Sequence, residues 1–215
     1  MYPHIITSTM YGFFFLTLII EWSFLEWWVH SQPMHKKEYK KVPLLGLLTG
    51  SHTNHHNAHN YSPKHAECFD HDHHHESILQ RLWFGPLVAF AGCVSFILFD
   101  WLTAFEYRLT LTAAILTYAY YWIFELAHVA SHDGKSWQRT FLQKIGVFDF
   151  ILKQHKGHHV RKLNRNYTLV NPLMDYVFNT QLDASPKSVM LARWITWTVL
   201  SAFVILFGIV LFLIH

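Results

Sequence analysis

Four long apolar segments constrain the fold more than any other feature of this 215-residue sequence. They cover about residues 9–30, 83–105, 109–130 and 190–214. About 20 apolar residues are enough to cross the roughly 30 Å hydrocarbon core of a bilayer as a helix. In that core a single segment can satisfy its own backbone N–H and C=O groups only as a helix. The sequence therefore predicts an all-α integral membrane protein with about four transmembrane helices.

Composition and charge agree with a membrane protein of one domain, spanning residues 1–215. Charged residues make up only 14% of the chain, against roughly 25% in soluble proteins. A net charge of +3 with scattered basic residues argues against nucleic-acid binding. Cys68 lies in a polar loop and Cys93 in an apolar run, which does not suggest a disulfide framework. The N-terminus lacks the basic region and cleavage site of a signal peptide, so we expect the first apolar segment to be retained.

The distribution of basic residues predicts the topology. If the chain crosses at all four segments, Arg108 is the only Lys or Arg on the side of the N-terminus, and the other sixteen of seventeen lie opposite. Basic loops favour the cytosolic face. We therefore expect residues 31–82 and 131–189 to form a cytosolic cap, with both termini on the other side of the membrane.

The most informative polar feature is a recurring histidine pattern. Ten of the eighteen histidines form four sets: His30 and His35; His52, His55 and His56; His128 and His132; and His155, His158 and His159. Residues three and four apart share one face of a helix, and imidazole is a suitable ligand for Fe, Zn, Cu and Ni. Each set lies at or just beyond an apolar segment, so all ten fall on the cytosolic side, near the membrane surface. The pattern predicts a metal site there.

The first histidine pair needs a break in its helix. His30 and His35 would lie about 140° apart on a continuous α-helix. Pro33 disfavours helix at Gln32, so we expect the helix to end near Ser31 and a turn to bring both histidines to one metal. Glu26 shares a helix face with His30. It could accept the second N–H of that imidazole or lie at the membrane interface, and the sequence leaves both alternatives open.

Ten imidazoles are too many for one metal ion but suit two. Five ligands each would leave one of six octahedral positions open, and an open position beside a redox metal suits O2 activation. Zinc would accept the same ligands but has no redox chemistry. The candidate carboxylates for offsetting the charge of two divalent ions from outside the ligand set are Glu26, Glu125, Asp133 and Asp175. We predict a dinuclear metal site at the membrane surface, and no catalytic residue beyond its ligands is apparent.

Several motifs carry a resemblance to a known family. They are EWWVHSQPMH (Glu26 to His35), HTNHH (His52 to His56), RLWFGP (Arg81 to Pro86), HVASH (His128 to His132), QHKGHH (Gln154 to His159) and NPLMDYVFNT (Asn171 to Thr180). In this order, over residues 21–180, they resemble the fatty acid hydroxylase (sterol desaturase) superfamily of integral-membrane di-iron oxygenases. The first pair is most similar to that of the fatty acid and sphingolipid 2-hydroxylases. Met174 stands where tryptophan is common in the family.

The resemblance implies a function and its cofactors. It implies two iron ions, which zinc can replace in purified protein, and O2 as cosubstrate. The expected reaction is hydroxylation of a C–H bond on a long-chain lipid from the bilayer, whether fatty acyl, sphingolipid or sterol-like. Electrons would come from a separate donor, a b-type cytochrome or a ferredoxin with its reductase. The alternatives are a desaturase or carotenoid hydroxylase with the same site, a metal-handling membrane protein, or an assembly protein with structural zinc.

One departure from the family pattern leaves the second histidine set open. About two dozen residues separate HTNHH from RLWFGP, where the family has few. This insert contains a further HxxHH, made of His71, His74 and His75, just before Arg81. We predict the set that begins at His52 as ligands and the later one as a metal-sensing or lid element. His59, three residues beyond His56, could also approach the site.

Overall fold

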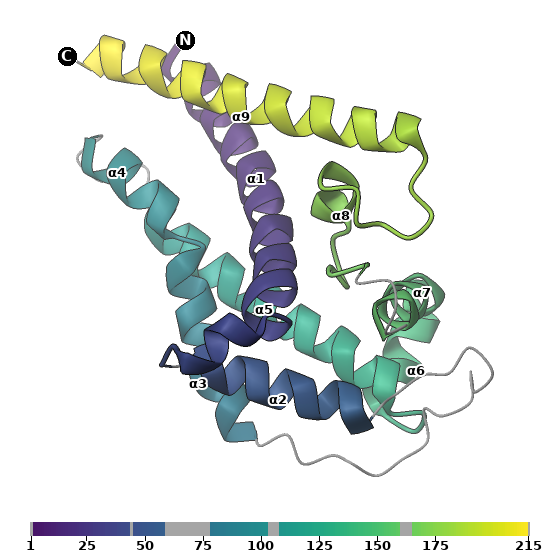
Figure 1. The fold of residues 1–215 in the computed structure, drawn as a ribbon. Helices are drawn as coiled ribbons and strands as arrows, with labels where there is room; N and C mark the ends of the chain where they lie inside the picture. Colours follow the sequence, from purple (N-terminus) through teal and green to yellow (C-terminus); the bar gives the residue numbers. More distant parts are fainter. Residues whose placement is uncertain (1, 44, 59–77, 103–107, 160–164, 215) are drawn as a thin grey trace.

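The computed structural model describes residues 2–43, 45–58, 78–102, 108–159 and 165–214, which form helices and no strand (Figure 1). In chain order the elements are α1 (Tyr2–Val29), the π-helical η1 (His30–Met34), the 3₁₀-helical η2 (Lys37–Lys41), α2 (Leu45–Ala58), α3 (Ile78–Ala91), α4 (Val94–Leu102), α5 (Leu109–His132), α6 (Trp137–Lys144), α7 (Phe148–His159), α8 (Leu173–Val177) and α9 (Pro186–Ile214). The all-α prediction is confirmed for these residues.

Three segments are long and apolar enough to cross a membrane: Thr9–Met34, Leu109–His132 and Pro186–Ile209. The predicted second span over residues 83–105 is bent, because Phe84–Ala91 of α3 and Val94–Trp101 of α4 meet at an angle of 47°. The spans number four if this bent pair crosses as one. Both chain ends lie at one end of the bundle, and α2, α6 and α7 lie toward the other (Figure 1). The fold is thus consistent with a membrane protein, while the division into spans and cap stays a prediction.

The bend between α3 and α4 follows from a close contact at Gly92. A Cβ built on Gly92 would lie 2.6 Å from Cγ2 of Thr117 on α5. Thr117 is fully buried, and its hydroxyl accepts a hydrogen bond of 2.9 Å from the indole N–H of Trp22 on α1. The Cys93 N–H bonds to Phe90 O, an i→i+3 contact that tightens the end of the helix. The chain therefore bends where only glycine fits against α5.

Replacing Gly92 by alanine is expected to destabilise the bundle. The added methyl group must displace the buried Thr117, and overpacking of this kind costs about 1–3 kcal/mol. Gly12→Ala is the matched control, because a Cβ at Gly12 on α1 meets no atom within 4 Å. That change should be neutral or stabilising by up to about 1 kcal/mol, through helix propensity. Thermal unfolding in detergent measures both, and equal melting temperatures for the two variants would contradict the packing argument.

Pro33 changes the helix without ending it. The sequence predicted a helix end near Ser31, yet the chain stays helical through Met34 as the π-helical turn η1, which contains Pro33. A π-helix pairs residue i with residue i+5, so residues five apart return to the same face. The rings of His30 and His35 accordingly lie with centroids 5.7 Å apart. The two histidines therefore come together as predicted, but a π-helical turn brings them together and not a break in the helix.

Two buried apolar clusters lie at opposite ends of α5. One joins α1, α4 and the start of α5 through Phe14, Phe96 and Leu109. The other packs α6 and α7 against the end of α5 and contains Ala127, Ala130, Leu142, Phe148, Ile151 and Leu169. The second cluster holds α7 beside α5, and both helices carry predicted histidine sets.

Candidate metal centre

Two groups of imidazoles gather where η1, α2, α5 and α7 meet. Cluster 1 contains His30, His35, His52, His56 and His158, and cluster 2 contains His55, His128, His132 and His155. Within each cluster one ligand atom per residue lies within 4.8 Å of all the others. Nε2 of His159 lies 3.0 Å from Nε2 of His155, so His159 adjoins cluster 2. All ten predicted histidines therefore come together, and their role as metal ligands stays a prediction.

Each HxxHH motif divides its histidines between the two clusters. In α2, His52 and His56 belong to cluster 1 and His55 to cluster 2. In α7 the same division is reversed, with His158 in cluster 1 and His155 in cluster 2. Residues i+3 and i+4 are neighbours in sequence and point about 100° apart around a helix. Both helices therefore lie between the clusters and can serve both.

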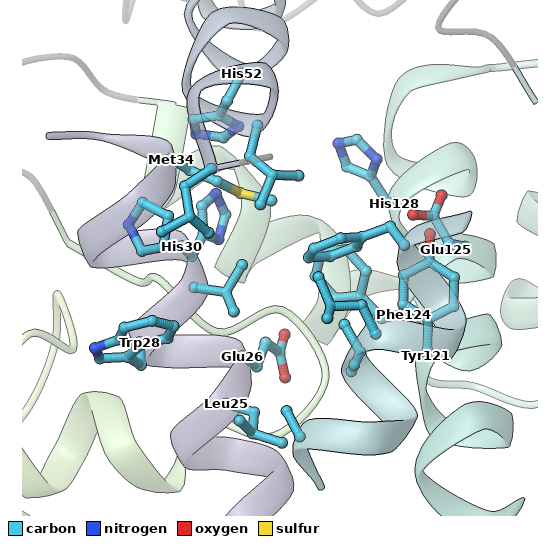
Figure 2. A pocket seen from close by; sticks show the side chains of 18 of the residues that line it. Leu25, Glu26, Trp28, His30, Met34, His52, Tyr121, Phe124, Glu125 and His128 are labelled. Carbon is cyan, nitrogen blue, oxygen red and sulfur yellow. The ribbon is translucent and has the colours of Figure 1, made fainter. Parts of the chain in front are cut away.

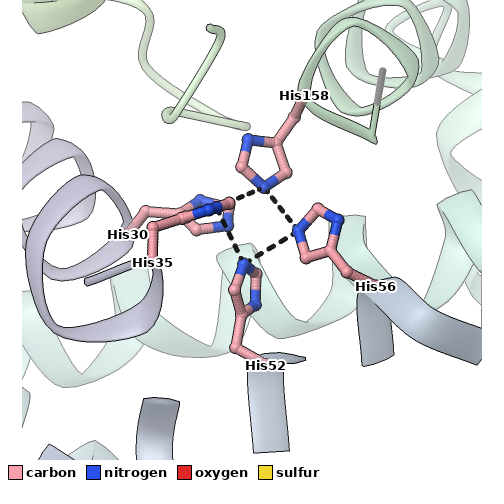
Figure 3. A group of neighbouring side chains, drawn as sticks. All are labelled: His30, His35, His52, His56 and His158. Atoms are coloured by element: carbon pink, nitrogen blue, oxygen red, sulfur yellow. Dashed lines mark hydrogen bonds between the residues drawn. The ribbon is translucent and has the colours of Figure 1, made fainter. Parts of the chain in front are cut away.

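Cluster 1 has the spacing that a bound metal ion requires. Figure 3 shows four Nε2 atoms in a closed ring, with His52 3.1 Å from His35, His56 2.9 Å from His52 and 3.0 Å from His158, and His158 3.2 Å from His35. Four nitrogens in a square, each about 2.1 Å from a common centre, would be about 3.0 Å apart. His30 supplies a fifth imidazole, with its ring centroid 4.0 Å from that of His158.

The outer nitrogens of cluster 1 indicate which nitrogen carries the proton. Nδ1 of His30 lies 2.6 Å from the carbonyl oxygen of Tyr167, and Nδ1 of His158 lies 3.3 Å from that of Arg165. A carbonyl oxygen only accepts, so each Nδ1 must donate and each Nε2 keeps its lone pair. Among the described residues, Nε2 of His30 is buried and has no hydrogen-bond partner. Lone pairs thus converge inside the cluster, as they do around a cation.

Burial keeps these imidazoles neutral. Burial lowers the pKa of His52, His155, His158 and His159 well below the ordinary value, and neighbouring histidines lower it further. Burial also lowers the pKa of His35 to about 4. Neutral imidazole is the form that binds metals. Neither cluster contains a carboxylate, so the possible metal ligands in both are imidazole nitrogens.

Two buried carboxylates hold the segment that faces His30. Asp175 accepts from the backbone N–H groups of Tyr167 at 3.0 Å and Thr168 at 2.8 Å. Glu26 accepts from the next two, those of Leu169 and Val170. Four consecutive backbone N–H groups that belong to no helix or sheet, three of them on buried residues, are satisfied in this way. The carboxylates therefore fix the Tyr167 carbonyl oxygen against Nδ1 of His30.

This arrangement corrects the expected role of Glu26. The suggested hydrogen bond from His30 to Glu26 is replaced by one to the Tyr167 carbonyl, while Glu26 also accepts from the hydroxyl of Tyr120 at 2.6 Å. Glu26 and Asp175 thus act on the site indirectly, by holding the backbone segment whose Tyr167 carbonyl oxygen contacts His30. The sequence did not predict roles for Tyr167 and Tyr120, because no local pattern marks residues that contact partners far away in the chain.

The other predicted residues lie as follows. Glu125 lies beside His128 on α5 (Figure 2). Asp133 follows α5 and accepts from the backbone N–H of Lys135 at 2.8 Å. Whether these two carboxylates offset metal charge stays a prediction. The set that begins at His52 reaches both clusters, whereas the alternative ligands His59, His71, His74 and His75 lie outside the described residues.

An apolar cavity of about 350 Å³ lies below the clusters, between α1, α2, α3 and α5 (Figure 2). His30, His52, His55 and His128 line it, and so do apolar side chains that include Leu25, Val88, Tyr121 and Phe124. Figure 2 shows the histidines at one end and Leu25 toward the other. Sites for small apolar molecules have such a lining, with a few polar groups at defined places. The cavity can therefore hold an apolar chain with one part beside the imidazoles.

Comparison with known proteins gives one curated relative. The chain is 28% identical over 120 residues, 54% of its length, to "Very-long-chain aldehyde decarbonylase GL1-5" of Oryza sativa subsp. indica. The chain spans only 19% of the length of that relative. No family model and no solved structure matches this chain. Over about half its length the chain is thus similar to an enzyme named for a very-long-chain aldehyde.

Proposed function

We propose that this chain belongs to the fatty acid hydroxylase superfamily and hydroxylates a C–H bond of a long-chain lipid at a two-iron centre. One observation carries the proposal: imidazoles from four helical elements converge in two adjacent clusters at one end of an apolar cavity. Two of the segments that line the cavity, Thr9–Met34 and Leu109–His132, are long and apolar enough to cross a bilayer. A lipid chain could enter it without leaving an apolar environment.

The donor set suits two redox-active ions. Cluster 1 would hold one ion, and cluster 2 together with His159 would hold the other. Bound iron would supply the electron-transfer chemistry for O2 activation, which imidazoles alone and zinc cannot supply. The overall reaction takes one lipid C–H bond, O2, two electrons and two protons, and yields one C–OH group and one water. The electrons would come from a separate b-type cytochrome or ferredoxin with its reductase.

The protein's own side chains would position the lipid. Apolar groups such as Leu25, Val88 and Phe124 would hold the chain and exclude water, while His52 and His128 mark the end where a carbon approaches the metals. The Tyr167 carbonyl would keep the proton of His30 on Nδ1, so that Nε2 stays a donor. The named substrate of the rice relative, a very-long-chain aldehyde, supports a long-chain lipid as the substrate class.

Oxygen labelling tests the proposal. Purified protein is loaded with ferrous iron, reconstituted into lipid vesicles, and given a chemical reductant and ¹⁸O2. We expect one ¹⁸O atom in a lipid product, detected by mass spectrometry. We expect none from the His158→Ala, His159→Ala double variant, which removes one member of cluster 1 and the histidine that adjoins cluster 2. A product that loses two hydrogens without gaining ¹⁸O would make the enzyme a desaturase. Metal binding with no lipid product under any donor would favour a metal-handling role.

A further inference from the structure

A row of apolar side chains on α6, the following turn and the start of α7 is exposed on the protein surface. Trp137, Phe141 and Ile145 are 67%, 45% and 54% exposed, and Val147 and Phe150 are 38% and 44% exposed. The first three are four residues apart and so share one face of a helix. An adjacent face of α6 buries Leu142 in the cluster with α5. We call this surface, from Trp137 to Phe150, the α6–α7 elbow.

The elbow lies at the level where a membrane-spanning α5 would leave the bilayer. α6 begins shortly after α5 ends at His132, yet Leu142 packs with Ala127 and Ala130, within the last turns of α5. α6 therefore turns back beside the end of the span (Figure 1). On α5 itself, Trp122 and Ile123 are also exposed, 39% and 52%. Apolar side chains are thus exposed both on the span and on the elbow.

The chemistry of the elbow suits the boundary between headgroups and acyl chains. α6 has eight residues, too few to cross a bilayer. Exposed Lys135 precedes the apolar row, and exposed Lys144 and Asp149 lie within it, next to Ile145 and Phe150. Helices that lie in the membrane surface combine an apolar face bearing tryptophan or phenylalanine with lysines that reach the headgroups. The charged residues before and within the row favour shallow insertion over deep insertion.

We propose that the α6–α7 elbow inserts into the bilayer surface beside α5 and thereby holds α7 at a fixed height above the lipid. His155, His158 and His159 lie on α7, so this contact sets how far both clusters stand from the acyl chains. The inference requires that α5 crosses the membrane. It depends neither on the metal nor on the proposed reaction.

Spin-label accessibility tests the proposal in reconstituted vesicles. Labels are placed singly at Phe141→Cys and Ile145→Cys, after both native cysteines are removed by Cys68→Ser and Cys93→Ala. Ile123→Cys, exposed on the predicted span, is the lipid control, and Glu38→Cys, exposed on η2, is the water control. Collisions with O2, which concentrates in lipid, are compared with collisions with a soluble nickel chelate. We expect the ratio of O2 to nickel collisions at residues 141 and 145 to exceed that at residue 38 at least ten-fold and to approach that at residue 123.

Two results would overturn the proposal. Labels that collide with nickel as often as at residue 38 would place the elbow in water. Labels screened from both reagents would mean that protein, such as a second copy of the chain, covers the elbow. The labels at residues 141 and 145 lie one helical turn apart, so a local distortion at one of them leaves the other informative. Circular dichroism and thermal unfolding of each labelled protein verify that it is folded.

Discussion

Replacing His52 and His56 together by alanine is expected to remove about one of two bound metal ions, whereas replacing His52 and His55 together should weaken both. The first pair belongs wholly to cluster 1, while the second takes one imidazole from each cluster. Even the loss of a group that only orients a ligand costs about 10–100-fold in metal affinity, and loss of a ligand costs more. The two double variants remove the same number of histidines from the same helix, so each is the control for the other.

The measurement is metal content per chain after reconstitution with ferrous iron and competition with a chelator. Competition makes a single missing nitrogen detectable. Thr53→Ala, an exposed change on α2, should retain both ions. The same comparison on α7 sets the pair His155 and His159 against the pair His155 and His158. Equal losses in all four double variants would contradict the division of each motif between two metals, and one zinc that survives them all would contradict a dinuclear centre.

Asp175→Ala is expected to be the most destabilising single change near the site. The Asp175 carboxylate is fully buried and accepts from two backbone N–H groups and from the hydroxyls of Thr168 and Thr180. Each buried donor left without an acceptor costs about 1–3 kcal/mol. The total loss, allowing for partial relaxation, should be on the order of 4 kcal/mol. Thermal unfolding in detergent measures it.

The matched control for Asp175→Ala is Asp183→Ala. Asp183 forms an exposed ion pair of 2.7 Å with Lys153, and exposed pairs contribute about 0–1 kcal/mol. Asp175→Asn keeps the shape and one carbonyl acceptor, so its loss should lie between the two alanine variants. Because Asp175 fixes Tyr167 against His30, Asp175→Ala should also weaken metal binding in cluster 1. Equal melting temperatures for the Asp175 and Asp183 variants would show that the Tyr167–Val170 segment does not depend on this carboxylate.

Local sequence patterns were sufficient to predict the all-helical fold and the four histidine sets. Long apolar segments and histidines at helical spacing predicted an all-α chain with ten imidazoles near one end of the bundle, and the structure brings all ten together. These predictions succeed because helix periodicity and the length of an apolar run depend only on neighbouring residues. The same patterns marked Pro33 as a change in the helix, but the predicted helix end near Ser31 is instead a π-helical turn that continues to Met34.

Other features depend on residues far apart in the sequence. Gly92 marks a bend because Thr117 lies against it, and Glu26 binds the backbone of Leu169 and Val170 instead of His30. The sequence shows that His55 and His56 point in different directions, but it does not show which histidines they meet. Those partners come from η1, α5 and α7, so the division into two clusters is set by how four helical elements pack. Helix period is a local property, whereas the composition of each cluster is a property of the tertiary structure.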